Sequence, residues 1–126
     1  MKREIKFRAW QPQGKRMFEV GDIDFIKEEV MLCHWGWESS NDIDLMQYAG
    51  REDKNKRQIC EGDIVRTGTD NIGDPEPMIG QVIMREGSWL IENEKKQEAI
   101  DLFSEITSRE VIGNIFEDKQ LLEGKQ

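Results

Sequence analysis

The feature that most restricts the fold of this chain is the close spacing of turn residues between short extended segments. In EIKFRAW (residues 4–10) apolar and polar side chains alternate, which is typical of a β-strand. Pro12 and Gly14 then favour a turn and RMFEV resumes an extended pattern, so residues 4–20 are predicted to form a hairpin. Eight to ten such strands follow one another, which predicts an all-β protein of small antiparallel sheets or a barrel.

The same signals recur along the rest of the chain. DIDFI is predicted to be a strand with Ile23 and Phe25 on one side, and a second hairpin is expected to turn at residues 86–88. EVIGNIFED has glycine and asparagine at positions 113–114, where a bulge or a sharp bend is expected. Further strands are predicted in EVMLCHW, DLMQYAG, QIC and EGDIV.

Helical signals are few. Four apolar residues between positions 99 and 106 have helical spacing, but other residues of 97–108 alternate, and a strand followed by a turn is preferred there. DKQLLEGKQ is predicted to contain one helical turn, so the chain has at most one or two short helical turns. The polar segment GWESSND is expected to be a loop that separates an N-terminal antiparallel β region, residues 1–40, from residues 41–126. The two regions are expected to form one compact folding unit.

The charge of the chain is unevenly distributed. Its formal net charge is −8, whereas residues 1–16 alone carry six basic residues and one acidic residue, a net charge of +5. An acidic protein is repelled by nucleic acid and by anionic lipid at long range. The basic segment is therefore interpreted in two ways, as a strand packed on acidic neighbours within or between subunits, or as a local patch for a phosphate backbone.

The sequence contains few residues in the patterns that are typical of catalytic or metal-binding sites. Cys33, Cys60 and His34 fall short of the four ligands of a structural zinc site, and no nucleophile elbow or phosphate-binding loop is present. Acidic pairs two residues apart are more typical of solvated strand faces than of metal sites. No enzymatic activity, metal or cofactor is therefore expected. Because no apolar run follows the charged N-terminus, we expect a cytoplasmic protein with reduced thiols and no membrane contact.

One surface is predicted to bind. If the first strand has one face in water, Lys6, Arg8 and Trp10 share that face, where lysine and arginine suit phosphates and an indole can stack on a base. The same pattern also occurs on ordinary strand faces and on protein-binding surfaces. Lys6, Arg8 and Trp10 are therefore a candidate face for nucleic acid or for protein.

The central segment DLMQYAGREDKNKRQICEGDIV is interpreted as architectural. DLMQYAG and QIC are predicted to pair across the charged REDKNKR, with Asn55 able to adopt the left-handed conformation at the tip. Gly62 is expected to allow a sharp bend into the next strand. Asp63 is expected to accept backbone N–H groups that would otherwise lack partners.

Three stretches together resemble the YopX-type family of phage and prophage proteins. They are IKFRAWQPQGKRM, LMQYAGREDKNKRQICEGDIV and EVIGNIFED, and they occur in the family's order over essentially the whole chain. The chain departs from the family pattern at Lys56, where glycine is usual, and at Cys60 and Phe116, where tyrosine is usual. Because Cys60 and Phe116 lack the hydroxyl group of tyrosine, neither hydroxyl can be needed for chemistry that the family shares.

The resemblance implies an N-terminal β-hairpin or meander followed by an SH3-like small barrel over residues 41–126. It also implies a phage or prophage origin and a place in the cytoplasm of a bacterial host, but no established activity. The expected role is a non-enzymatic accessory protein that binds protein, as a homo-oligomer or with another phage or host protein. The alternative is a nucleic-acid-binding module that uses the basic N-terminal hairpin.

Overall fold

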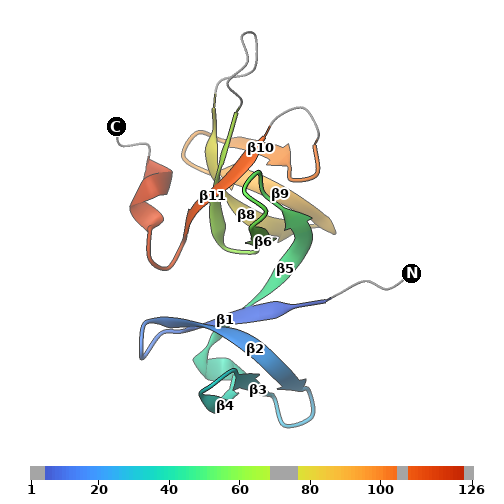
Figure 1. The fold of residues 1–126 in the computed structure, drawn as a ribbon. Coiled ribbons are helices and arrows are strands. Elements are labelled where there is room, and N and C mark those ends of the chain that lie inside the picture. The colour runs from blue at the N-terminus through green and yellow to red at the C-terminus, as the bar shows by residue number, and fades with distance from the viewer. Residues whose placement is uncertain (1–4, 69–76, 105–107, 124–126) are drawn as a thin grey trace, which may run out of the picture. The chain divides into compact units, whose positions relative to one another are not determined.

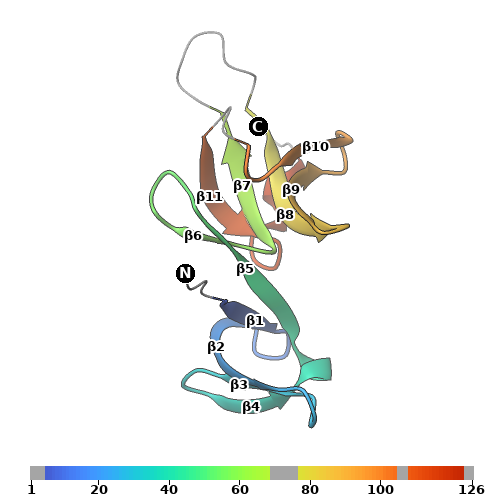
Figure 2. The ribbon, with the colours of Figure 1, turned by 90° about the vertical axis from the view of Figure 1, so that its right-hand side faces the viewer.

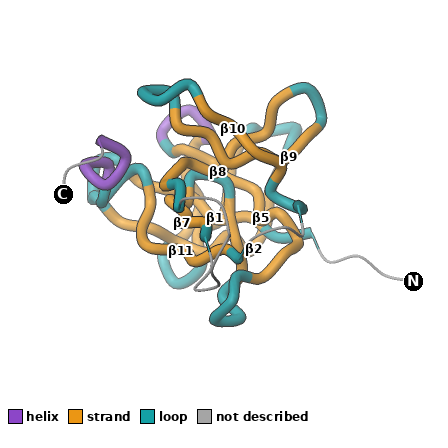
Figure 3. The backbone as a smooth tube through the Cα atoms, turned by 90° about the horizontal axis from the view of Figure 1, so that it is seen from above, coloured by secondary structure: helices purple, strands orange, loops and turns teal. Residues whose placement is uncertain are grey.

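The computed structural model describes residues 5–68, 77–104 and 108–123. Its strands are all antiparallel, and in the described residues the only helical segments are two short 3-10 turns, η1 and η2 (Figures 1 and 3). The predicted all-β class and the expectation of at most two helical turns are therefore confirmed. The strands are β1 (Phe7–Gln11), β2 (Arg16–Asp24), β3 (Glu29–Leu32), β4 (Gly36–Ser39), β5 (Asp44–Glu52), β6 (Gln58–Cys60), β7 (Asp63–Thr67), β8 (Ile79–Arg85), β9 (Ser88–Asn93), β10 (Glu98–Asp101) and β11 (Arg109–Asn114); η1 is Ser40–Asp42 and η2 is Lys119–Glu123.

The chain divides into an N-terminal unit, Met1–Tyr48, and a C-terminal unit, Ala49–Gln126. The boundary lies inside β5, not in the loop at residues 36–42 as predicted. The prediction was wrong because GWESSND is not a loop throughout: it contains β4 and η1. Figure 2 shows β5 as one continuous strand, and its neighbours in the sheet are β1 and β6.

The N-terminal unit is a meander in which β1 is hydrogen-bonded to β2 and β5, β2 to β3, and β3 to β4. The predicted hairpin is confirmed, because β1 and β2 pair antiparallel from Arg8 opposite Glu19 to Gln11 opposite Arg16. One face of this sheet holds the core, because alternate residues of a strand share a face. The buried core residues are Ala9, Phe18, Val30, Leu32 and Ile43.

The C-terminal unit contains a five-stranded sheet in the order β10-β9-β8-β7-β11. The predicted barrel is not closed, because in this sheet the described strands β10 and β11 are the two ends and do not pair with each other. The hairpin predicted at residues 86–88 is confirmed, and Glu86 and Gly87 both have positive φ, as in a type I′ hairpin turn. The core consists of Ala49, Ile59, Val65, Met78, Val82, Ile91, Leu102 and Val111.

Two ambiguous segments of the C-terminal unit are resolved in their described parts. Residues 98–101 form β10 and Leu102 follows in a turn, so the preferred strand and turn are confirmed there, while positions 105–107 lie outside the described residues. The irregularity predicted in EVIGNIFED is also confirmed, because the pairing of β11 with β7 shifts register between Val111 and Gly113.

The bend at the start of β7 is built as the sequence predicted. Gly62 has a φ of 88°. Its N–H donates to the carbonyl of Val82 in β8 at 3.0 Å, and its carbonyl accepts the N–H of Ile115, the residue after β11, at 2.9 Å. Gly62 therefore links the start of β7 to both neighbouring strands. Asp63 is 1% exposed, and its Oδ2 accepts the N–H of Cys60 at 2.8 Å. Both residues are therefore structural.

The turn between β5 and β6 differs from the prediction in one residue. Lys56, and not Asn55, has positive φ, at 67°. The physical reason is that the side chain of Asp53 fixes the backbone of the turn. Its Oδ1 accepts the N–H of Asn55 at 2.8 Å and the N–H of Arg57 at 2.8 Å. The left-handed residue is thereby displaced to Lys56, the position at which the resembling family has glycine.

Asp53 also ties this turn to a strand far away in the sequence. Its Oδ2 accepts the N–H of Val111 at 2.9 Å, and the N–H of Lys54 donates to the Arg109 carbonyl at 2.9 Å. Burial alone would raise the pKa of Asp53, but the three backbone N–H donors and the positive charge of Arg57 outweigh it and hold that pKa below the usual range.

Candidate binding surfaces

The predicted face of Lys6, Arg8 and Trp10 is not an open surface. Arg8 is 7% and Trp10 is 8% exposed, whereas Lys6 is exposed. The expectation of one face in water was wrong because both faces of β1 are covered: Arg8 and Trp10 are buried on one face and Ala9 on the other. A nucleic-acid surface built from all three side chains is therefore not present.

Lys6 belongs to a small mixed cluster instead of a basic patch. Its Nζ lies 5.4 Å from the centre of the Tyr48 ring, and the Tyr48 hydroxyl donates to Glu19 Oε2 at 2.7 Å. Such a cation–ring contact at an exposed site is worth about 0.5–1 kcal/mol. The nearby carboxylate of Glu19 would repel a phosphate group, so this cluster is better suited to holding β5 against β1 and β2.

The most exposed large apolar side chains of the described chain lie at the turn between β2 and β3. Phe25 is 81% and Ile26 is 94% exposed, and together we name them the apolar tip. The turn is held by Asp24, whose Oδ1 accepts the N–H groups of Ile26 and Lys27, each at 3.0 Å. Adjacent apolar side chains exposed on a defined turn are a feature of binding surfaces rather than of ordinary surface.

The apolar tip was missed by the sequence reasoning, which placed Phe25 on the same face as Ile23. The strand ends at Asp24, so the alternation does not continue to Phe25. Ile23 packs against the core as expected, while Phe25 projects into solvent. The signal that could have found this is Asp24 itself, because an aspartate that hydrogen-bonds the next two or three N–H groups favours a turn.

The surroundings of the apolar tip are acidic. Residues 22–29 contain four carboxylates and one lysine, a net charge of −3; they are Asp22, Asp24, Glu28 and Glu29, with Lys27. Of these acids, Asp22 and Glu28 are exposed and the other two are half-buried. The apolar tip therefore lies in a negatively charged stretch of the chain.

A second group of aromatic side chains lies at the opposite end of β2. The ring centres of Phe18 and Trp35 are 5.6 Å apart. The guanidinium of Arg16 lies 5.3 Å from the Phe18 ring and 5.8 Å from the Trp35 ring. We name Arg16, Phe18 and Trp35 the aromatic end. Trp35 remains 53% exposed although its indole N–H donates to Glu38 Oε2 at 2.7 Å, so this end also presents apolar surface.

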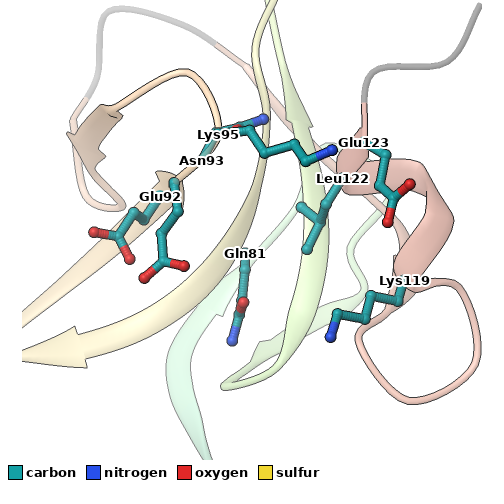
Figure 4. A pocket seen from close by; sticks show the side chains of 8 residues that line it. Gln81, Glu92, Asn93, Lys95, Lys119, Leu122 and Glu123 are labelled. Atoms are coloured by element: carbon teal, nitrogen blue, oxygen red, sulfur yellow. The ribbon is translucent and has the colours of Figure 1, made fainter.

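The C-terminal unit has an open cleft of about 240 Å³ between η2 and the strands β8 and β9 (Figure 4). Its polar groups are largely engaged elsewhere: Asn93 donates to the Ile79 carbonyl at 2.7 Å, and Glu92 pairs with Arg85 at 2.6 Å. The remaining lining mixes both charges without a convergent set, so the cleft offers no arrangement for catalysis. The lining residues are Gln81, Glu92, Asn93, Glu94, Lys95, Lys119, Leu122 and Glu123.

In residues 5–68, 77–104 and 108–123, no group of three or more histidine, cysteine, aspartate or glutamate residues could hold a metal ion. Cys33 and Cys60 are not joined in a disulfide. No helix of this part of the chain is both long and apolar enough to cross a membrane.

These observations define a class, a small all-β protein of two units built from antiparallel strands. The family model described as YopX protein matches residues 6–123, so the chain belongs to the YopX family. The family resemblance inferred from the three sequence stretches is thereby confirmed.

One solved structure extends this comparison. The crystal structure of protein EF1440 from Enterococcus faecalis is similar over 96% of this chain and 99% of that chain, with a TM-score of 0.66 and 20% sequence identity. At this identity the likeness shows the fold alone. No curated protein matches the sequence.

Proposed function

We propose that this chain is a non-enzymatic accessory protein of a phage or prophage that acts in the bacterial cytoplasm by binding protein, with the apolar tip as its main contact. The observation that carries the proposal is the exposure of Phe25 and Ile26, at 81% and 94%. Neither side chain belongs to the buried core of the N-terminal unit.

The energetics support this role. Burying one large apolar side chain contributes about 1.5–3 kcal/mol, so the two residues of the apolar tip supply enough for the centre of a binding site. Their turn is already held by Asp24, so little conformational entropy is lost when a partner binds. This combination of anchor and preorganisation is characteristic of residues that dominate protein–protein affinity.

The proposal is tested by replacing Ile26 with a photo-cross-linking amino acid and identifying the proteins captured in infected cells. Ile26→Asp, in affinity purification without the cross-linker, is expected to abolish capture while leaving the melting temperature nearly unchanged, because exposed substitutions usually alter stability by less than about 0.5 kcal/mol. Gln97→Asp is the matched control, since Gln97 is exposed in a turn of the C-terminal unit and gains the same charge. Equal capture by both variants would contradict the proposal.

A further inference from the structure

Two exposed apolar groups of the N-terminal unit, the apolar tip and the aromatic end, cannot meet within one copy; Ile5, Trp37 and Leu45 are exposed as well but belong to neither group. The apolar tip follows the last residue of β2, Asp24, and the aromatic end contains its first residue, Arg16. Nine residues of strand span roughly 25–30 Å. Trp35 is fixed at the start of β2 by its contacts with Arg16 and Phe18. Each group can therefore be covered only by another molecule or by a distant part of the chain.

The two groups are complementary in charge. The apolar tip lies within residues 22–29, which carry a net charge of −3. At the aromatic end Lys15 and Arg16 are exposed. Glu38, the carboxylate in contact with this end, already accepts hydrogen bonds from Trp35 and from Gln11, the latter at 3.1 Å. An incoming acidic hairpin therefore meets cations beside aromatic rings.

The acids next to the β1–β2 turn do not spoil this complementarity. Asp44 is in register with Trp10, whereas Phe18 is in register with Ala9. Because successive residues of β1 point to opposite faces, Asp44 lies on the face of the sheet opposite to Phe18. Asp42 and Asp44 line a depression with Pro12 and Gln13.

We propose that copies of this chain associate head to tail, with the apolar tip of one copy packed on the aromatic end of the next. The proposal rests on the protein-binding function proposed above and names a second copy of the chain as the partner. Phe25 and Ile26 cover the exposed ring of Trp35, while Asp24 and Glu28 lie near the cations of the neighbouring copy. One contact of this kind covers both apolar groups at once.

Such a contact is heterologous, which means that it joins two different surfaces and repeats from copy to copy. A twofold contact between two apolar tips would instead bring a net charge of −3 against a second −3. Like charges placed opposite each other oppose association. The charge distribution therefore favours the head-to-tail arrangement over a symmetric contact through the tips.

Sedimentation velocity of the full chain, from about 5 µM to about 200 µM, tests the inference. The wild type is expected to increase in mean mass with concentration, and to do so less at about 500 mM than at about 50 mM salt. Ile26→Asp and Arg16→Glu are each expected to weaken association by roughly tenfold or more, as central contact residues do. Gln97→Asp is expected to behave as the wild type.

Mixing the two weakened variants separates this arrangement from the alternatives. The Ile26→Asp protein keeps an intact aromatic end and the Arg16→Glu protein keeps an intact apolar tip, so an equimolar mixture should form dimers that grow no further. A mixture that stays monomeric, or a wild type that is monomeric at about 200 µM in low salt, would overturn the inference. If Arg16→Glu fails to fold, Lys15→Glu takes its place in the same mixture.

The outcome for self-association is distinguishable from the outcome for the proposed function. If the wild type is monomeric but Ile26→Asp still loses capture of a different protein, head-to-tail association is wrong and the protein-binding role stands. If the wild type is monomeric and capture is also unchanged, both are wrong. If both single variants associate as the wild type does, the contact lies elsewhere and the inference is again overturned.

Discussion

Replacing Asp53 with alanine should destabilise the protein more than replacing an exposed aspartate that holds a turn, such as Asp101. The carboxylate accepts three backbone N–H groups, from Asn55, Arg57 and Val111, at 2.8, 2.8 and 2.9 Å. Asp53 itself is 7% exposed. Alanine removes all three acceptors and offers no replacement, so the turn loses its internal bonds and its link to β11.

The magnitude follows from how well water can replace each acceptor. Val111 is 6% exposed, so its N–H is left without a partner in a buried place, which costs about 1–3 kcal/mol. Asn55 and Arg57 are exposed, so water can reach their N–H groups and each loss adds only about 0.5–1 kcal/mol. The total is about 2–5 kcal/mol, a large share of the 5–15 kcal/mol that stabilises a typical domain.

Thermal and denaturant unfolding measure this loss, and amide hydrogen exchange at Val111 locates it. We expect a melting temperature lower by roughly 10–20 °C and faster exchange at Val111. Asp101→Ala is the matched control, because Asp101 is exposed and its Oδ1 accepts the N–H of Phe103, two residues away, at 2.8 Å. If both variants melt within about 1 °C of each other, the carboxylate of Asp53 does not hold the turn, and the reasoning fails.

The same carboxylate predicts a pH dependence. Because the pKa of Asp53 in the folded protein lies below its ordinary value of 3.8, its contribution to stability is fully present above that value. The contribution is lost as the pH falls through the lower folded pKa. Asp53→Asn should therefore be less stable than the wild type at neutral pH, and the difference should shrink in strong acid. A constant difference from pH 7 down to pH 2 would argue against an ionised Asp53.

The remaining predictions concern backbone conformation and packing, and unfolding free energies check each of them. Lys56→Gly should stabilise the protein by about 0.5–1 kcal/mol, because φ is 67° there and glycine removes the strain; a loss of stability would contradict this. Gly62→Val should cost about 1–3 kcal/mol at a φ of 88°, while Lys54→Ala should cost under about 0.5; equal melting temperatures for Gly62→Val and the wild type would refute the architectural interpretation. Gly80→Ala should cost about 1–3 kcal/mol, since the new Cβ would lie 2.8 Å from a side-chain atom of β9; a neutral result would mean that the strands separate easily.

Sequence patterns were sufficient where the determining interaction is local. The hairpin at residues 86–88 depends on turn residues and their immediate neighbours, and the bend at Gly62 depends on one residue that tolerates positive φ. The acceptor role of Asp63 is equally local, since its partner Cys60 is three residues away. Such features can be predicted from a few consecutive letters.

Features that depend on distant neighbours were not predictable in the same way. Arg8 and Trp10 were expected on an open face, but both are buried, and what covers a strand face depends on segments far away in the sequence that no local pattern encodes. The bond from Val111 to Asp53 joins residues 58 positions apart. The exposure of Phe25 was missed for a different reason, because an alternating pattern does not reveal the residue at which a strand ends.

The turn between β5 and β6 has a consequence for how this protein behaves in a crowded cell. β11 is the last strand of its sheet, and its outward N–H at Val111 and outward carbonyl at Arg109 would be free to recruit another chain as an extra strand. Asp53 and Lys54 occupy both groups. The turn therefore prevents another chain from pairing with this edge of the sheet. A variant that loosens it should form fibrils or precipitate at temperatures where the wild type remains dispersed.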